Sequence, residues 1–113
     1  IGLLEKGTTV IIPEIADYEI RRSFILNDLE DSIHRLNELV NILEYQPITT
    51  GIMRKAAELW AEARRKGLPT ADPKELDSDV ILAAQALHAG AVVATENVGH
   101  LSRFVESKNW KDI

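Results

Sequence analysis

Acidic side chains occur in this sequence at three places where they could build a metal site for phosphate chemistry. Glu19 follows a β-branched run, and Asp77 and Asp79 precede a long aliphatic stretch. A third polar cluster, Thr-Glu-Asn at 95–97, follows a second apolar run. Carboxylates that crowd together raise one another's pKa, and a divalent cation removes this conflict. Two such ions about 4 Å apart can activate water and hold both oxygens of a phosphoryl displacement. The pattern therefore indicates phosphoryl chemistry.

Each of these groups also has a structural interpretation, which the sequence alone leaves open. Asp77 or Ser78 can cap a helix, and Asp79 can favour the positive end of that helix. Glu19 can form a surface ion pair with one of the two arginines that follow it. The hydroxyl of Thr95, at the end of an apolar run, more often satisfies the backbone than it catalyses.

Two apolar runs and four amphipathic segments give the order of the elements. Residues 8–12 and 91–95 lack polar alternation, which is typical of strands buried on both faces. We expect a helical turn at 98–104 and a short strand at 108–113 after them. Helices are predicted over residues 13–26, 28–43, 51–66 and 79–89. The buried stripe expected for the third helix is Ile52, Ala56, Leu59, Trp60 and Ala63. Buried strands separated by helices imply right-handed crossovers, so the sequence predicts an α/β fold with a mainly parallel sheet.

The boundaries of these elements carry further predictions. The first seven residues have the pattern of a helix end closed by Gly7, so we expect the chain to begin inside a helix and to lack the strand before it. Residues 27–30 resemble a capping box for the second helix. Pro47 interrupts the helices, and Thr49 or Thr50 can cap the third one.

The predicted topology brings the polar clusters to one edge of the sheet. In an open parallel sheet, ligands bind beyond the carboxyl ends of the strands. Both apolar strands end at that edge, and the helix over 79–89 begins there because it runs antiparallel to the strands. Seven side chains are therefore expected to converge: Glu14, Asp17, Glu19, Asp77, Asp79, Glu96 and Asn97.

Composition limits the kind of site and the kind of protein. The 113 residues suffice for one domain, and they include no cysteine and only three well-separated histidines. A metal ion would therefore be bound by oxygen, which points to Mg²⁺ or Mn²⁺. The absence of cysteine fits a reducing cytoplasm, and no apolar run approaches the roughly 20 residues that cross a membrane. The net charge of −5 argues against non-specific nucleic-acid binding but permits a nucleic-acid enzyme.

Two segments, "PEIADYEIRRSF" and "DSDVILAAQALHAGAVVATENVGHLSRF", together with the helices between them, resemble the PIN domain. The family pattern has an acid on the helix after the second strand, an aspartate before an alanine-rich helix, and Thr-x-Asn after the next strand. Glu19 falls at the first position, Asp79 at the second, and Thr95 with Asn97 at the third. The resemblance covers essentially the whole chain as one domain, residues 1–113.

This resemblance implies a PIN-like three-layer fold and a metal-dependent ribonuclease that uses Mg²⁺ or Mn²⁺. By the same resemblance, Glu19 and Asp79 would be metal ligands, and Asp77 would be an auxiliary acid of that metal site. Asn97 would orient water or substrate, and Thr95 would support the site by hydrogen bonding. The family includes the toxin nucleases of VapC-type toxin–antitoxin pairs, so an RNA substrate and an antitoxin protein are the implied partners.

The sequence departs from the family pattern at two points. No segment matches the family's first strand, which ends in a catalytic aspartate, and His100 stands where a carboxylate is common. We therefore expect weak or no activity from this polypeptide, and a catalytically idle PIN-like binding or assembly module is the alternative function. The apolar stripe of the helix over 28–43 can serve either the monomer core or a homodimer.

Overall fold

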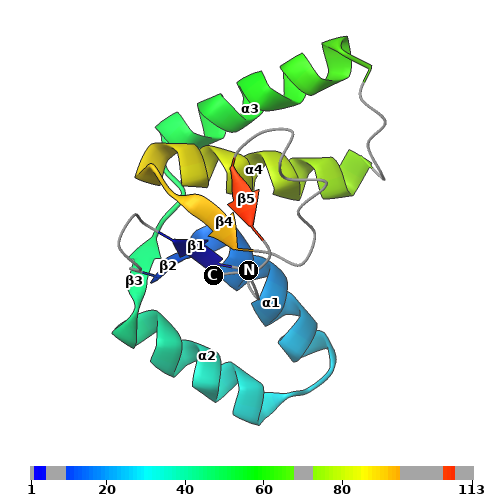
Figure 1. Ribbon diagram of the computed structural model, residues 1–113. Coiled ribbons are helices and arrows are strands. Elements are labelled where there is room, and N and C mark those ends of the chain that lie inside the picture. The colour runs from blue at the N-terminus through cyan, green and yellow to red at the C-terminus, as the bar shows by residue number, and fades with distance from the viewer. Residues whose placement is uncertain (1, 5–9, 68–72, 95–105, 109–113) are drawn as a thin grey trace.

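The structure is a computed structural model that describes residues 2–4, 10–67, 73–94 and 106–108 (Figure 1). Its strands are β1 (Gly2–Leu4), β2 (Val10–Pro13), β3 (Glu44–Gln46), β4 (Val92–Ala94) and β5 (Ser107–Lys108). Its helices are α1 (Glu14–Leu26), α2 (Glu30–Ile42), α3 (Thr50–Arg65) and α4 (Pro73–Ala89). The predicted turn at 98–104 and most of the predicted strand at 108–113 lie outside the described residues.

The five strands form one sheet in the order β3-β2-β1-β4-β5. β2 pairs with β3, and β4 pairs with β5, in parallel. β1 is antiparallel to both of its neighbours, so β2 and β4 run in the same direction. Four of the five strands therefore share one direction, as the predicted mainly parallel sheet requires.

The prediction that the chain begins in a helix is wrong for Gly2–Leu4, which form the central strand β1. Leu3 is the register partner of Ile11 on one side and of Val93 on the other. A short apolar run fits a helix or a strand equally well by pattern. Hydrogen bonding to a strand on each side decides for the strand here. β3 was not predicted either, because its three residues are too few to show a periodicity.

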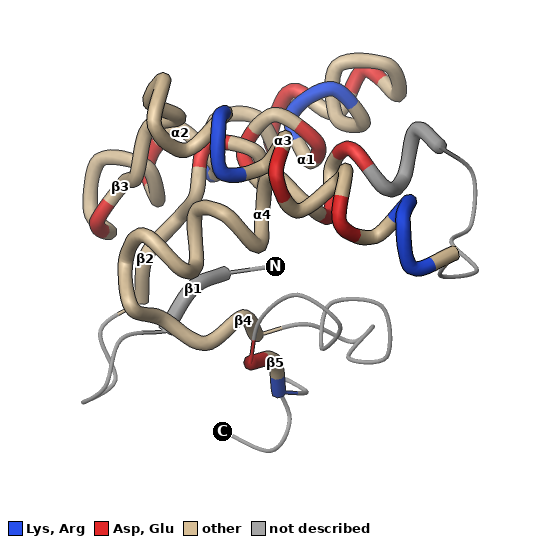
Figure 2. Tube along the Cα trace, turned by 90° about the horizontal axis from the view of Figure 1, so that it is seen from above, with Lys and Arg blue, Asp and Glu red and all other residues tan. Residues whose placement is uncertain are grey.

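All four described helices lie on one side of the strands (Figure 2). Burial alternates accordingly: Ile11, Pro13 and Val93 are fully buried, whereas Val10 and Val92 are more exposed. The prediction that β2 and β4 are buried on both faces is therefore wrong for these residues. The described part of the chain does not test whether a third layer covers the other face of the sheet. The core lies between the sheet and the pair α3–α4, where Ile52, Ala56 and Leu59 meet an aliphatic face of α4.

Helix ends differ from the prediction at two places. α4 begins at Pro73 rather than at 79, so Asp77 and Ser78 lie inside the helix and cannot be its N-caps. The capping box at 27–30 is absent, because the N-cap of α2 is Leu29, without a side-chain bond. These residues close α1 instead: Asp28 has a φ of 55°, and the Leu29 N–H donates to the Phe24 carbonyl at 2.9 Å.

The third helix follows its sequence pattern closely. Thr49 is the N-cap, and its hydroxyl accepts a hydrogen bond from the Ile52 N–H at 3.2 Å. Four of the five residues predicted as the buried stripe are buried, but Trp60 is 37% exposed. No helix among the described residues is both long enough and apolar enough to cross a membrane.

Candidate functional site

α1 brings Glu19 to the edge of the buried helix layer. Pro13 ends β2 and is the N-cap of α1, and Ile15 and Ala16 in the first turn are buried. Glu19 follows Ile15 by four residues and so lies one turn further along the same face. Its side chain is 31% exposed, which leaves the carboxylate accessible but partly removed from water.

α4 brings a second acid to this point. Burial is the largest effect on Glu19 and raises the pKa of its carboxyl group, and the negative charge of Asp79 raises it further. The groups that lower this pKa include Arg22, through its charge, and Ser78, through a hydrogen bond from its side chain. The structure thus brings Glu19 and Asp79 together from different helices, with Ser78 beside them. Their role as metal ligands stays a prediction.

Arg22 is the basic neighbour of this pair. Its guanidinium lies 4.0 Å from the Glu19 carboxylate, three residues away on α1, and it stacks 5.1 Å from the ring centre of Tyr18. The Arg22 side chain is more than half exposed, so the ion pair contributes little to stability. The surface ion pair that the sequence left open is therefore present, together with the electrostatic interaction between Glu19 and Asp79.

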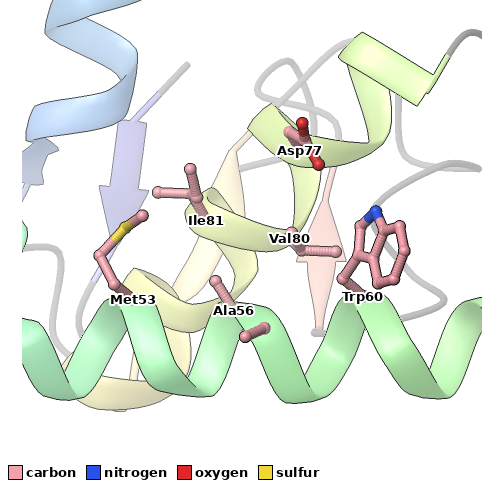
Figure 3. A pocket seen from close by; sticks show the side chains of 7 residues that line it. Met53, Ala56, Trp60, Asp77, Val80 and Ile81 are labelled. Carbon is pink, nitrogen blue, oxygen red and sulfur yellow. The ribbon is translucent and has the colours of Figure 1, made fainter.

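Asp77 lies on a different side of α4. Residues two apart on an α-helix point about 200° from each other, so Asp77 and Asp79 diverge. The exposed Asp77 lines a groove of about 350 Å³ between α3 and α4 (Figure 3). The other lining residues are Met53, Ala56, Ala57, Trp60, Val80 and Ile81. The structure therefore does not group Asp77 with Glu19.

The two other acids of α1 are engaged elsewhere. Glu14 accepts a hydrogen bond from the Ile48 N–H at 2.7 Å. Asp17 pairs with Arg21 at 3.0 Å and accepts a hydrogen bond from the Tyr45 hydroxyl at 3.4 Å. The predicted convergence is therefore wrong for Glu14 and Asp17, because both carboxylates hold neighbouring elements to α1. The remaining candidates, Thr95, Glu96, Asn97 and His100, lie outside the described residues.

Sequence reasoning missed Gln85, a fully buried polar residue of α4. Its side-chain oxygen accepts a hydrogen bond from the Ile15 N–H of α1 at 3.2 Å. Its side-chain nitrogen donates to the Gln46 carbonyl of β3 at 2.8 Å. The available signal was one amide inside the aliphatic stretch VILAAQAL, because an amide buried among aliphatic residues needs hydrogen-bond partners.

Comparison with known proteins decides the family. The family model described as "PIN domain" matches residues 1–104. The chain belongs to the PIN domain family. This confirms the assignment made from the sequence, and with it the PIN-like α/β fold. No curated protein sequence matches the chain.

Two solved structures share this PIN fold. One is the crystal structure of VapBC2 from Rickettsia felis bound to a DNA fragment from the VapBC2 promoter. It is 21% identical, with a TM-score of 0.75 over 92% of this chain and 77% of that one. The other is VapBC-1 from nontypeable Haemophilus influenzae, also 21% identical. Its TM-score is 0.72 over 96% of this chain and 79% of that one. At this identity the likeness establishes the fold alone.

The acidic pair of this PIN domain fits a small divalent ion in its donor chemistry. Mg²⁺ is commonly held by one or two carboxylates, with waters and substrate phosphates as its other ligands. Glu19 and Asp79 provide two carboxylates, of which one carries a raised pKa that a cation would relieve. Within the described ranges no three or more acidic, histidine or cysteine side chains gather as a metal-binding group. Glu19 and Asp79 are therefore two candidate carboxylate ligands.

Proposed function

We propose that this PIN domain is a metal-dependent endoribonuclease that hydrolyses RNA phosphodiester bonds at Glu19 and Asp79. The observation that carries the proposal is the electrostatic interaction between these two acids of different helices, by which the charge of Asp79 raises the pKa of Glu19. Membership of the PIN family supports it, because these acids fall at the two acidic positions by which the sequence resembles the PIN nucleases. Mg²⁺ or Mn²⁺ is the proposed ion, since both accept carboxylate oxygen ligands.

The described residues have distinct tasks in this proposal. When bound, the ion supplies positive charge that neutralises the phosphate and lowers the pKa of water. Glu19 and Asp79 would hold the ion through their carboxylate oxygens. Ser78 stabilises the charged form of Glu19 by its hydrogen bond. Arg22 is exposed beside the pair and can contact a phosphate oxygen of the substrate. Thr95 and Asn97 are proposed to support and orient the reacting groups.

The test incubates the protein with single-stranded RNA in the presence of Mn²⁺, of Mg²⁺ or of EDTA. Cleavage is expected only with a divalent ion, and Asp79→Asn should abolish it. Arg35→Gln is a matched control, because Arg35 is an exposed residue of α2. Cleavage that survives both EDTA and Asp79→Asn would show that the proposed site is wrong.

A catalytically idle PIN module is the second candidate function. It is favoured by the lack of a third acidic ligand among the described residues. In that case calorimetry would detect no binding of Mn²⁺ to the protein. Asp79→Asn would then leave the binding of any protein or RNA partner unchanged.

We further propose two partners for the protein, a cytoplasmic antitoxin protein and a second copy of the chain. The antitoxin rests on the resemblance to VapC-type toxins and on the two VapBC structures that share the fold. The homodimer rests on apolar side chains exposed where α1 meets α2 and along α2. They are Ile25, Leu26, Leu29, Leu39 and Ile42. Leu36, in the predicted stripe, is buried and serves the monomer.

Sedimentation measurements test the homodimer directly. The weight-average mass should rise with protein concentration, and Ile42→Glu should reduce that rise because it places a charge in the exposed apolar patch. A strictly monomeric protein at high concentration would remove the homodimer. Co-purification with the product of an adjacent gene tests the antitoxin.

A further inference from the structure

Gln85 is the only polar side chain among the fully buried residues of the described core. It lies between Ala84 and Ala86 on α4, which are also buried. An amide in such surroundings costs free energy unless its polar atoms are hydrogen-bonded. The partners of Gln85 therefore show what its presence achieves.

The hydrogen bonds of Gln85 join three elements that are distant in the sequence. Its side chain accepts from Ile15 of α1 and donates to the Gln46 carbonyl of β3. The two glutamines bond reciprocally, because the Gln46 side chain donates to the Gln85 backbone carbonyl at 3.0 Å. The α1 helix, the end of β3 and the C-terminal half of α4 are thus tied at one buried point.

The bond to Ile15 does more than satisfy Gln85. The first four N–H groups of a helix lack partners inside the helix, and Ile15 is the second residue of α1. The N-cap of α1 is Pro13, which provides no side-chain bond. Gln85 therefore acts as a cap that comes from another helix, and it anchors the first turn of α1 to α4.

The acidic pair lies close to this anchor along both helices. Glu19 follows Ile15 by four residues, about one turn or 6 Å, and Asp79 precedes Gln85 by six residues, about 9 Å. A second bond, from the Ile48 N–H to Glu14, holds the same turn of α1 against the segment before α3. Two ties on one turn oppose rotation of α1 about its axis, which would move Glu19 away from Asp79.

We propose that Gln85 is a positioning residue, which fixes α1 against α4 so that Glu19 and Asp79 face the same ligand. The ligand part of this inference rests on the proposed function, whereas the helix positioning does not. Its side-chain hydrogen bonds go to Ile15 and Gln46, and its part in this proposal is the placement of α1.

The experiment replaces Gln85 by Met, which keeps the length of the side chain but removes both of its bonds. The affinity for Mn²⁺, measured by electron paramagnetic resonance, should fall by about 10–100-fold, as for residues that orient metal ligands. Residual dipolar couplings should show a changed angle between α1 and α4. Leu36→Ala is the control: it removes a buried side chain of α2 and should leave the affinity and the angle unchanged.

The readouts separate the two proposals. If the unsubstituted protein binds no Mn²⁺, the proposed function fails, and the dipolar couplings still test the positioning. An unchanged angle with Gln85→Met would overturn the positioning role. If that variant does not fold, hydrogen exchange of the unsubstituted protein decides. The Ile15 amide should exchange as slowly as the core amides of α4, and exchange at the rate of a frayed helix end would refute the anchor.

Discussion

Glu19 on α1 and Asp79 on α4 are electrostatic neighbours, although most of the chain lies between them in sequence. Burial and then the Asp79 charge raise the pKa of Glu19, against the opposing effects of Arg22 and Ser78. A raised carboxyl pKa means that the folded protein disfavours the charged form. The charged Glu19 therefore lowers the stability of the folded protein, and a cation bound to the pair would raise it.

Glu19→Gln should stabilise the metal-free protein near neutral pH. The folded pKa of Glu19 lies above its ordinary value of 4.5, so its stability contribution is fully present below that value. That contribution is lost as the pH rises through the folded pKa. Gln cannot ionise, so the stability gain should appear above pH 4.5 and vanish below it. Urea unfolding across this pH range measures the effect, and a variant less stable at neutral pH would contradict it.

Asp79→Asn and Asp77→Asn should differ sharply in metal binding. Asp79 adjoins Glu19, so its loss should weaken Mn²⁺ binding by more than the roughly 10–100-fold typical of residues that only support a ligand. Asp77 lines the α3–α4 groove and should leave the affinity nearly unchanged (Figure 3). Isothermal titration calorimetry makes the comparison. Equal losses of Mn²⁺ affinity in both variants would show that Asp77 belongs to the metal site.

Asp28→Gly should raise stability by roughly 0.5 kcal/mol. Asp28 has a left-handed backbone with φ of 55°, which costs a side-chain-bearing residue more than it costs glycine. Part of this gain is offset by the greater freedom of glycine in the unfolded chain. Glu38→Gly, at an exposed position inside α2, is the control and should lose about 1 kcal/mol. Thermal unfolding of both variants provides the measurement.

Thr49→Ala should cost about 1 kcal/mol of unfolding free energy, because it removes the side-chain cap of α3. Thr50→Ala should change stability by less than about 0.5 kcal/mol, since Thr50 is an exposed first residue of the same helix. The sequence allowed either threonine as the cap. Similar losses of unfolding free energy in the two variants would show that the Thr49 hydroxyl is not the stabilising N-cap of α3.

Tyr45→Phe should reduce the loss of stability in alkali. Burial, followed by the charges of Glu14 and Asp17, raises the pKa of Tyr45 to about 12. An unfolded chain releases this proton near pH 10, so the contribution is present below pH 10 and is lost as the pH rises towards 12. Denaturant unfolding at several pH values above 9 checks this. Tyr18→Phe is the control, because Tyr18 is exposed.

The sequence predicted the helices well where one face had to be apolar. α1 and α3 match the predicted ranges within a residue, and the buried stripe of α3 matches at Ile52, Ala56, Leu59 and Ala63. Short elements were less predictable. β1 and β3 have three residues each, so only pairing with neighbouring strands determines their state. The start of α4 was missed because polar residues precede its aliphatic part.

The candidate site was predictable in its residue types but not in its grouping. The predicted topology placed Glu14, Asp17, Glu19, Asp77 and Asp79 at one edge of the sheet, and the resemblance to the PIN domain singled out Glu19 and Asp79, with Asp77 as an auxiliary acid. The fold engages Glu14 and Asp17 in hydrogen bonds to neighbouring elements, and the helical period turns Asp77 away from Asp79.

The sequence by itself determined the PIN family, the helical periods and the oxygen chemistry of any metal site, because these depend on residue type and order. Only the tertiary structure decided which acids meet. That choice depends on how α1 is rotated and held against α4, and buried bonds such as those of Gln85 fix this arrangement across the sequence. A one-dimensional pattern can mark an amide that needs hydrogen-bond partners, but it does not show which groups those partners are.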